Sequence, residues 1–181
     1  MVHSKRPRAH EISLAAPLVT IENCGMPKQS AGLLLHRLRG RELEVFLVHP
    51  GGPFWAKKDA GAWTIPKGEF TDGEDPLTAA KRELREETGV AVEGPFSPLG
   101  TVRQAGGKLI HGWIAAGDFD ADAIVSNTFK MIWPPRSGKW SEFPEVDRAG
   151  WFSLTVAAEK INPAQAEFLH RLRAALDAAT T

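Results

Sequence analysis

Apolar residues in this chain are grouped in short, branched runs that polar turns separate. Residues 31–38 and 43–49 are two such runs, and the polar turn 39–42 between them predicts a strand pair. The same pattern predicts further strands, the first two of them joined by a glycine turn, at 99–104, 108–115, 128–133 and 150–154. The segment 50–61 is rich in glycine, proline and lysine and predicts a long loop.

Two segments have the apolar spacing of helices instead. Asp75 can cap a helix that begins at Pro76, where a missing N–H costs nothing, and Gly89 can end it. The sequence Asn-Pro-Ala-Gln at 162–165 predicts a capping box before a second helix, whose apolar positions are Phe168, Leu169, Leu172 and Leu176. Helices mixed with these strands predict an α/β fold with a mixed β-sheet.

Composition limits the choice of class and partners. The chain has 181 residues, 43% of them hydrophobic, which predicts one domain with a sizeable core. Lys plus Arg equal Asp plus Glu at 22 each, so neither nucleic acid nor a membrane is an expected partner. The single Cys24 excludes an internal disulfide and favours the cytoplasm. Residues 1–25 predict a flexible arm before a domain at 26–181.

The segment GEFTDGEDPLTAAKRELREETGV, which starts at Gly68, holds a set of residues at fixed offsets. They fit the pattern G-x5-E-x7-R-E-U-x-E-E-x-G-U, where U is aliphatic, at Gly68, Glu74, Arg82, Glu83, Leu84, Glu86, Glu87, Gly89 and Val90. The pattern therefore joins a glycine-containing loop to the first predicted helix.

Three glutamates of this segment, Glu83, Glu86 and Glu87, share one arc of the predicted helix at about 100° per residue. Like charges at this spacing destabilise an isolated helix by a few tenths of a kcal/mol per pair, so we expect a cation against the arc. Oxygen ligands with no His or Cys nearby favour Mg²⁺ first and Mn²⁺ second. Taken alone, the arc could be a solvated, ion-paired surface, but the accompanying loop residues argue against that.

The pattern is the Nudix box, and the sequence resembles the Nudix (MutT-like) hydrolases. The resemblance implies a Nudix-type α/β/α sandwich with the mixed β-sheet between helices. It also implies Mg²⁺-dependent hydrolysis of a diphosphate linkage by a metal-activated water. On this resemblance the metal ligands are Glu83, Glu86 and Glu87, helped by a backbone carbonyl near Gly68.

The remaining residues of the box would support the site. The resemblance implies that Glu74 and Arg82 form an ion pair that fixes the loop against the helix. Gly68 and Gly73 would let the loop backbone approach metal and phosphates, and Gly89 would end the helix.

The general base is a box glutamate in some members of the family and an acid from a later loop in others. Here the later candidates are Glu142 and Glu145, which we place in a loop before the strand at 150–154. A solvated loop carboxylate is the alternative for each, since a base must reach the water and a sequence does not show reach.

Substrate phosphates need cations as well as a metal. Lys67 is the first candidate because it lies at the mouth of the box. The other candidates in flanking loops, each with a solvated surface charge as its alternative, are Lys57, Lys58, Arg103, Arg136 and Lys139. A nucleobase needs an aromatic platform, for which we select the loop tryptophans Trp55 and Trp140, whereas Trp113 and Trp133 are expected in the core.

The substrate is expected to be a small nucleotide, either a dinucleoside polyphosphate or a nucleoside triphosphate. The sequence WTIPKGEFTDGED is similar to the diadenosine polyphosphate hydrolase branch. The similarity covers only about a dozen residues, so it is weak evidence for the substrate. Nucleotide sugars, capped RNA ends and diphosphoinositol phosphates stay open, as does a non-catalytic module that binds nucleotide and regulates a partner. Isoprenoid isomerases are disfavoured because Cys24 lies in the arm. The oligomeric state is open, a homodimer included.

Overall fold

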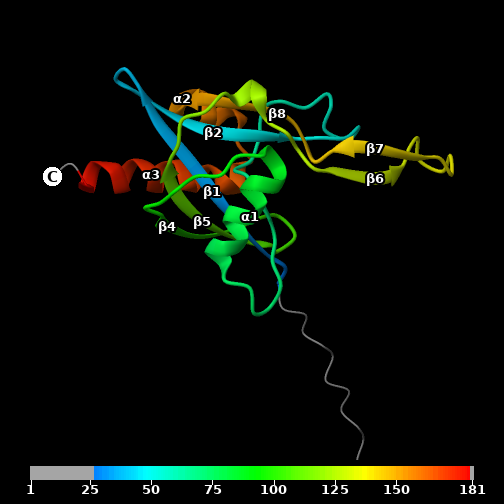
Figure 1. The fold of residues 1–181 in the computed structure, drawn as a ribbon, viewed down its shortest axis with the longest axis horizontal. Coiled ribbons are helices and arrows are strands. Elements are labelled where there is room, and N and C mark those ends of the chain that lie inside the picture. The colour runs from blue at the N-terminus through cyan, green and yellow to red at the C-terminus, as the bar shows by residue number, and fades with distance from the viewer. Residues whose placement is uncertain (1–26, 180–181) are drawn as a thin grey trace, which may run out of the picture.

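The computed structural model describes residues 27–179, so Cys24 and the predicted arm at 1–25 lie outside the described residues. The strands are β1 (Gln29–Arg39), β2 (Glu42–Pro50), β3 (Lys67–Glu69), β4 (Ser97–Arg103), β5 (Leu109–Ala116), β6 (Thr128–Ile132), β7 (Trp140–Pro144) and β8 (Val146–Ser153). The helices are α1 (Pro76–Thr88), α2 (Leu154–Lys160) and α3 (Ala166–Ala179), with 3₁₀ turns η1 (Ala121–Ala123) and η2 (Pro163–Gln165). Figure 1 shows their arrangement.

The main sheet is mixed, as predicted. Its strand order is β4-β5-β1-β2-β8, and β3 pairs with the start of β1. The β1–β5 pair is parallel, whereas β1–β2, β2–β8, β4–β5 and β1–β3 are antiparallel. The predicted strand pair β1–β2 and the predicted hairpin β4–β5 are therefore confirmed.

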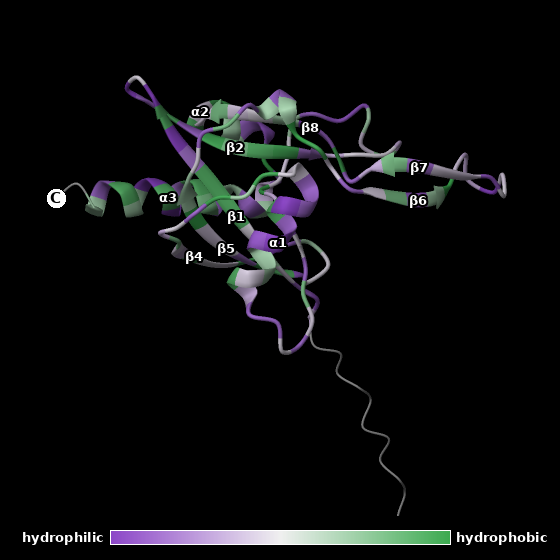
Figure 2. Ribbon diagram, viewed as in Figure 1, coloured by the Kyte–Doolittle hydropathy of each residue, from purple (hydrophilic) through white to green (hydrophobic). Residues whose placement is uncertain are grey.

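Both faces of this sheet are apolar, because β1 and β2 are hydrophobic at consecutive positions rather than at alternate ones. Leu34 and Leu47 face a core that they share with α2 and α3. Leu33 and Phe46 point to the opposite face, where α1 packs. Figure 2 shows the hydrophobic centre of the sheet and the polar surface of α1. The sheet thus lies between helical layers, which confirms the α/β/α sandwich.

Three elements escaped the sequence analysis. β3 is only three residues long. α2 occupies two turns directly after β8, which contains all but the last residue of the strand predicted at 150–154. β7 includes Glu142, which we placed in a loop. Its alternation of half-buried and exposed residues has the period of a strand, but Pro144 and the polar composition hid it.

The capping-box prediction is half right. Asn162 caps the turn η2 by accepting a hydrogen bond from the amide of Ala164 at 3.0 Å. Gln165 does not reach back to the cap, because its side-chain Oε1 accepts from the Ile65 amide and its Nε2 donates to Thr64 Oγ1. This buried amide therefore ties the start of α3 to the segment that leads into β3.

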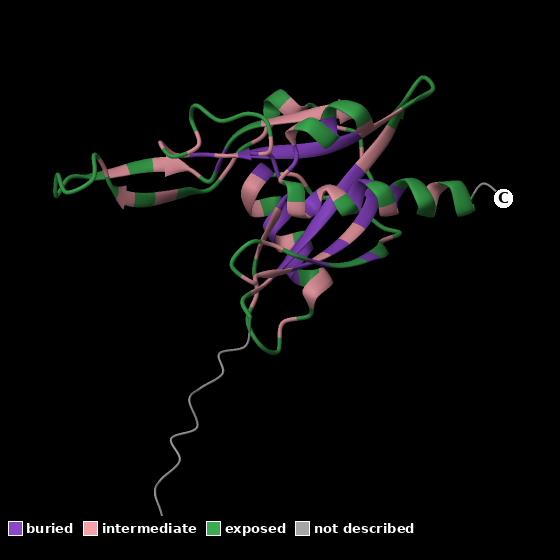
Figure 3. Ribbon diagram, turned by 180° about the vertical axis from the view of Figure 1, so that it is seen from behind, coloured by how far each residue is buried: buried purple, intermediate pink, exposed green. Residues whose placement is uncertain are grey.

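The β6–β7 hairpin forms a separate two-stranded sheet that projects from the body of the molecule (Figure 1). Figure 3 shows its residues as half-buried or exposed, in contrast to the buried strands of the main sheet. Trp133 follows β6 and touches Phe54 edge-on at 5.4 Å between ring centroids, outside both core clusters, so its assignment to the core was wrong. Within residues 27–179 no helix is long and apolar enough to cross a membrane.

Candidate active site

Helix α1 begins and ends where the sequence predicts. The Asp75 carboxylate accepts hydrogen bonds from the Thr78 amide and hydroxyl, both at 2.9 Å, and Pro76 occupies the first turn. Gly89 adopts φ 73°, a left-handed conformation that favours glycine, and its amide donates to the Arg85 carbonyl at 2.8 Å. These caps fix the rotation and the length of the helix.

The apolar stripe of α1 packs on β1, so its acidic stripe is directed at the loop before the helix. Ala79, Ala80 and Leu84 are buried among side chains of β1 and β2. Glu83 lies next to this stripe and is buried as well, with 9% of its surface exposed. A buried carboxylate beside a hydrophobic core needs a charged or hydrogen-bonding partner.

Gly68 and Lys67 bring the loop backbone directly onto the acidic stripe. A Cβ at Gly68 would lie 1.9–2.3 Å from the carboxylate atoms of Glu83, so only glycine leaves room for that carboxylate. One residue earlier, the Lys67 amide donates to Glu87 Oε2 at 3.0 Å. The pairing of β3 with β1, in which Gly68 opposes Ala31, holds both contacts in place.

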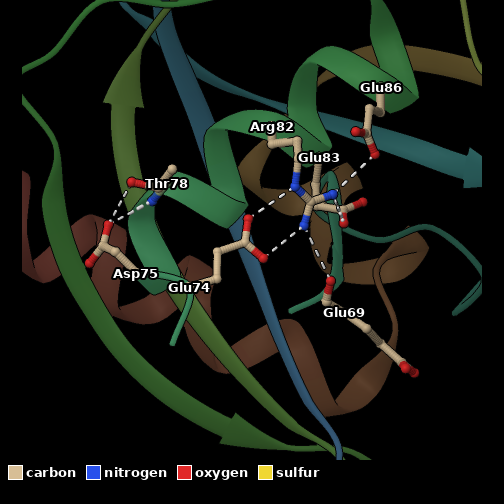
Figure 4. Close-up of polar contacts among 7 residues, drawn as sticks. All are labelled: Glu69, Glu74, Asp75, Thr78, Arg82, Glu83 and Glu86. Carbon is tan, nitrogen blue, oxygen red and sulfur yellow. Dashed lines mark hydrogen bonds and ion pairs between the residues drawn. The ribbon is translucent and has the colours of Figure 1, made fainter. Parts of the chain in front are cut away.

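Arg82 lies at the centre of the polar contacts in Figure 4. Its Nε and Nη2 donate to the two carboxylate oxygens of Glu74, at 3.0 and 3.2 Å. Its Nη1 donates to Glu83 Oε1 at 2.6 Å and to Glu86 Oε2 at 3.1 Å, while Nη2 also reaches the Glu69 carbonyl at 3.3 Å. The expected Glu74–Arg82 pair is thus present and bidentate, the strongest geometry for this pair of groups.

Burial shifts the ionisation of the side chains around this contact. Burial raises the pKa of Glu87 to about 8, against the attraction of Lys67. Burial also raises the pKa of Glu83, although the Arg82 hydrogen bond acts in the opposite direction. The pKa of Lys67 is lowered by burial, with Glu87 opposing the shift. All three shifts favour neutral forms, as expected where buried charge lacks full compensation.

The donors present fit a hard divalent cation. Three carboxylates and the Gly68 backbone offer oxygen alone, and the glycine leaves the space that a close approach needs. In residues 27–179 no three acidic, His or Cys side chains already converge into a cation-holding group. Figure 4 shows that Glu83 and Glu86 are both paired with the Arg82 guanidinium.

The two candidate bases are placed differently. The Glu145 amide donates to the Asn127 carbonyl at 2.8 Å and so continues the β6–β7 ladder by one pair. Glu142 lies within β7, whereas Glu145 lies in the bend between β7 and β8. The negative charge of Glu145 acts on both Glu83 and Glu87, whereas Glu142 accepts a hydrogen bond from Thr128 on an exposed surface.

The predicted phosphate-binding cations do not all gather around the carboxylates. Lys67 does, through its own backbone and charge. Lys58 lies over the Trp55 ring at 4.4 Å in the loop 51–61, where Lys57 is exposed. The hairpin turn carries the two further candidates, Arg136 and Lys139.

A buried histidine that the sequence analysis overlooked holds the base of the 51–61 loop. His49 is 0% exposed, its Nδ1 lies 2.6 Å from Asp147 Oδ1, and its Nε2 lies 2.8 Å from the Lys58 carbonyl. A polar residue at the end of an apolar strand was the available signal. Asn127 was also missed, since its amide donates to the Glu86 carbonyl at 2.9 Å and its carbonyl accepts from Glu145. Only backbone atoms make these contacts, so the sequence carries no side-chain signal for them.

A family model for the NUDIX domain matches residues 26–172. The chain belongs to the NUDIX family. That match includes the box, all strands of the main sheet and the first half of α3. The family assignment made from the box is therefore confirmed.

Curated relatives match this chain over short segments. Nudix hydrolase 25 of Arabidopsis thaliana is 67% identical over 30 residues, which are 17% of this chain and 17% of that protein. An RNA pyrophosphohydrolase of Dinoroseobacter shibae is 69% identical over 32 residues, 18% of this chain and 20% of the relative. The matched segments thus span about a fifth of these relatives' lengths.

Solved structures share the NUDIX fold over most of the chain. An Ap4A hydrolase of C. elegans in a binary complex has a TM-score of 0.60 and 22% identity, with 82% of this chain and 98% of that chain covered. The NUDIX domain of Shewanella oneidensis NrtR, complexed with ADP ribose, has a TM-score of 0.59 and 19% identity over 84% and 90% of the two chains. These likenesses confirm the fold.

Proposed function

We propose that this NUDIX protein hydrolyses a diphosphate linkage in a nucleoside diphosphate derivative, with Mg²⁺ as its metal and Mn²⁺ as a substitute. The observation that carries the proposal is the close packing of Gly68 against Glu83, beside Glu86 and Glu87 on one face of α1. Relatives named Nudix hydrolase and RNA pyrophosphohydrolase, which are 67% and 69% identical to this chain over 30 and 32 residues, support the proposal. A small nucleotide such as a dinucleoside polyphosphate or a nucleoside triphosphate is the proposed substrate.

Glu83, Glu86 and Glu87 would hold the cation, with the carbonyl at Gly68 as a further oxygen donor. A divalent ion there neutralises phosphate charge and acidifies a water molecule. Arg82 keeps Glu74 and the loop in position through its Nε and Nη2. Lys67 stands one residue before Gly68 and supplies a positive charge for the substrate phosphates.

Glu145 is the proposed general base. It stands across from the α1 carboxylates, and its backbone is fixed by hydrogen bonds to Asn127 and Gly51. In the reaction the water oxygen forms a bond to phosphorus, the phosphoanhydride bond to the leaving phosphate breaks, and Glu145 accepts the water proton. Glu142 lies within β7, where Thr128 donates a hydrogen bond to it, and serves as the control.

The test is turnover in Mg²⁺ of a panel that contains diadenosine tetraphosphate, ordinary and oxidised nucleoside triphosphates, ADP-ribose and a diphosphoinositol phosphate, with products separated by chromatography. Glu145→Gln should lower kcat by about 10²-fold or more, the range for a lost general base, while Glu142→Gln should leave it unchanged. An equal effect of both substitutions would remove Glu145 from the role of base. Binding of nucleotide without turnover of any compound would favour the regulatory module instead.

A further inference from the structure

The β6–β7 hairpin is rooted at the candidate active site. The Asn127 amide is bonded to the Glu86 carbonyl of α1, and the Val125 amide is bonded to the Thr88 carbonyl at 3.0 Å. On the other strand, the Glu145 carbonyl accepts from the Gly51 amide at 2.8 Å. The hairpin, the loop 51–61 and the catalytic helix therefore meet at one point.

One face of the hairpin, here called the inner face, runs outward from Glu145. Strand pairing continues at both ends, since the Trp133 amide also donates to the Lys139 carbonyl at 2.9 Å. Residues that oppose each other across an antiparallel pair lie on the same face, and every second pair returns to it. Beyond Asn127 and Glu145, the inner face thus consists of the strand pairs Phe129–Phe143 and Met131–Ser141. Trp133 and Lys139, joined by that hydrogen bond, follow beyond the strands.

The inner face carries aromatic rings near its root and at its outer end, with Met131 and Ser141 between them, and it is basic at the outer end. Phe129 and Phe143 stack in a tilted arrangement at 6.0 Å, and Trp133 contacts Phe54, which is 58% exposed, from the neighbouring loop. Lys139 stands opposite Trp133, to whose amide its carbonyl is bonded, and Arg136 lies in the turn between them. Aromatic rings for stacking next to cations for phosphate are the features that bind nucleotides without dependence on the base.

Charge along this face changes sign from root to tip. Glu145 is the acid at the root, where a cation and the attacked phosphate are proposed to lie. Lys139 is six residues further along an extended strand, which corresponds to about 20 Å. A ligand that contacts both ends must therefore extend beyond the phosphates bound at α1.

We propose that Trp133, Phe54 and Lys139 form a binding site for the distal nucleotide of an extended substrate, an inference that rests on the proposed function. The nucleobase stacks at the aromatic pair, and Lys139 contacts a phosphate. Two kinds of substrate carry such a distal nucleotide. In a dinucleoside polyphosphate it is the second nucleoside, and in an RNA with a 5′-polyphosphate it is the next nucleotide of the chain.

The test compares two exposed lysines of the same hairpin that lie on opposite faces. Lys139→Glu reverses the charge on the inner face, and Lys130→Glu makes the identical change on the outer one. Dissociation constants are measured by calorimetry without divalent cation for diadenosine tetraphosphate, a 5′-triphosphorylated oligoadenylate and ATP. Circular dichroism checks that both variants fold.

Lys139→Glu should weaken binding of at least one long compound by about tenfold, the scale of one lost contact to a charged group, and leave ATP unchanged. Lys130→Glu should change none of the three. Weaker binding of diadenosine tetraphosphate alone, or of the oligoadenylate alone, identifies which of the two ligands the site binds. Phe54→Leu, which removes the ring without exposing a cavity in the core, should act on the same compound as Lys139→Glu.

Equal effects of the two lysine substitutions, an equal loss for ATP, or no binding of long compounds by the wild type would overturn the distal site. None of these results bears on Mg²⁺-dependent turnover, which tests the proposed function separately. Conversely, absent turnover with selective, Lys139-dependent binding would reject hydrolysis and keep the site.

Discussion

A single added methyl group at Gly68 should lower the activity of the protein strongly and its stability only slightly. The Cβ of Gly68→Ala would lie 1.9 Å from Glu83 Oε2, whereas ordinary contacts begin at 3.4 Å. The Glu83 carboxylate must therefore move by about 1.5 Å to reach a normal van der Waals separation. Misplacing a reacting group by about 1 Å can lower a rate by 10²-fold, so we expect kcat to fall by at least about that factor.

Stability should respond far less than activity. The clashing atoms are the far end of a flexible side chain, and Gly68 does not have a positive φ. Moving Glu83 off its rotamer costs about 0.5–1.5 kcal/mol, while replacing glycine by alanine stabilises by about 0.4–1 kcal/mol through the unfolded chain. The melting temperature of Gly68→Ala should thus stay within a few degrees of the wild type.

Gly73→Ala is the matched control in the same loop. Gly73 has φ +97°, and nothing lies within 4 Å of the position of an added Cβ. The resemblance gave Gly73 a part in the approach of the loop to the phosphates, but an added Cβ there meets no neighbouring atom. This substitution should therefore destabilise the fold by about 1 kcal/mol through backbone strain and lower kcat of the folded enzyme far less than Gly68→Ala does. Turnover against diadenosine tetraphosphate and thermal melts give both quantities. Full activity in Gly68→Ala would refute the view that turnover requires the Glu83 carboxylate to lie against the Gly68 backbone.

Three further substitutions test the surrounding contacts. Arg82→Ala should lower the free energy of unfolding by about 1 kcal/mol. Arg82→Lys should lower it by less, because lysine keeps the charge but cannot bind Glu74 bidentately. Equal melting temperatures of the wild type and the two variants would contradict this. Burial raises the pKa of Glu87 from 4.5 to about 8, so the folded metal-free protein retains a proton that the unfolded chain releases, and stability should fall as pH rises through that window. Glu87→Gln should remove this part of the slope in denaturant titrations at several pH values, and an unchanged slope would assign it elsewhere. Gln165→Ala should cost about 2–3 kcal/mol because two buried polar partners lose their hydrogen bonds; a loss below about 0.5 kcal/mol in the same titrations would contradict that.

The sequence was informative where local rules determine structure. The caps of α1 and the strands of the main sheet follow from residue type and period, because Asp75, Pro76 and Gly89 act on their own backbone neighbours. The same holds for the Glu74–Arg82 pair, whose fixed offset implied proximity. Both partners lie within one loop–helix unit.

Contacts between distant segments were beyond the sequence. Gln165 looked like a capping residue, yet its side chain serves Thr64 and Ile65 about a hundred positions away. Trp133 looked like a core residue because it is large and apolar, but the hairpin that carries it leaves the main sheet. Glu142 and Glu145 could not be distinguished from the sequence, because the difference lies in their neighbours: the charge of Glu145 acts on Glu83 and Glu87, whereas Glu142 pairs with Thr128.

The Arg82 contacts explain how an acidic stripe can exist on α1 before any cation binds. Like charges at this spacing repel, and Nη1 of Arg82 reduces that repulsion by bonding Glu83 and Glu86 together. The bonds to Glu74 use different nitrogen atoms, Nε and Nη2. A divalent cation can therefore replace Nη1 at the two carboxylates without breaking the pair that holds the loop. Cation binding should therefore not change the contribution of the Glu74–Arg82 pair to the free energy of unfolding. We expect Arg82→Ala to lower the melting temperature both with and without Mg²⁺.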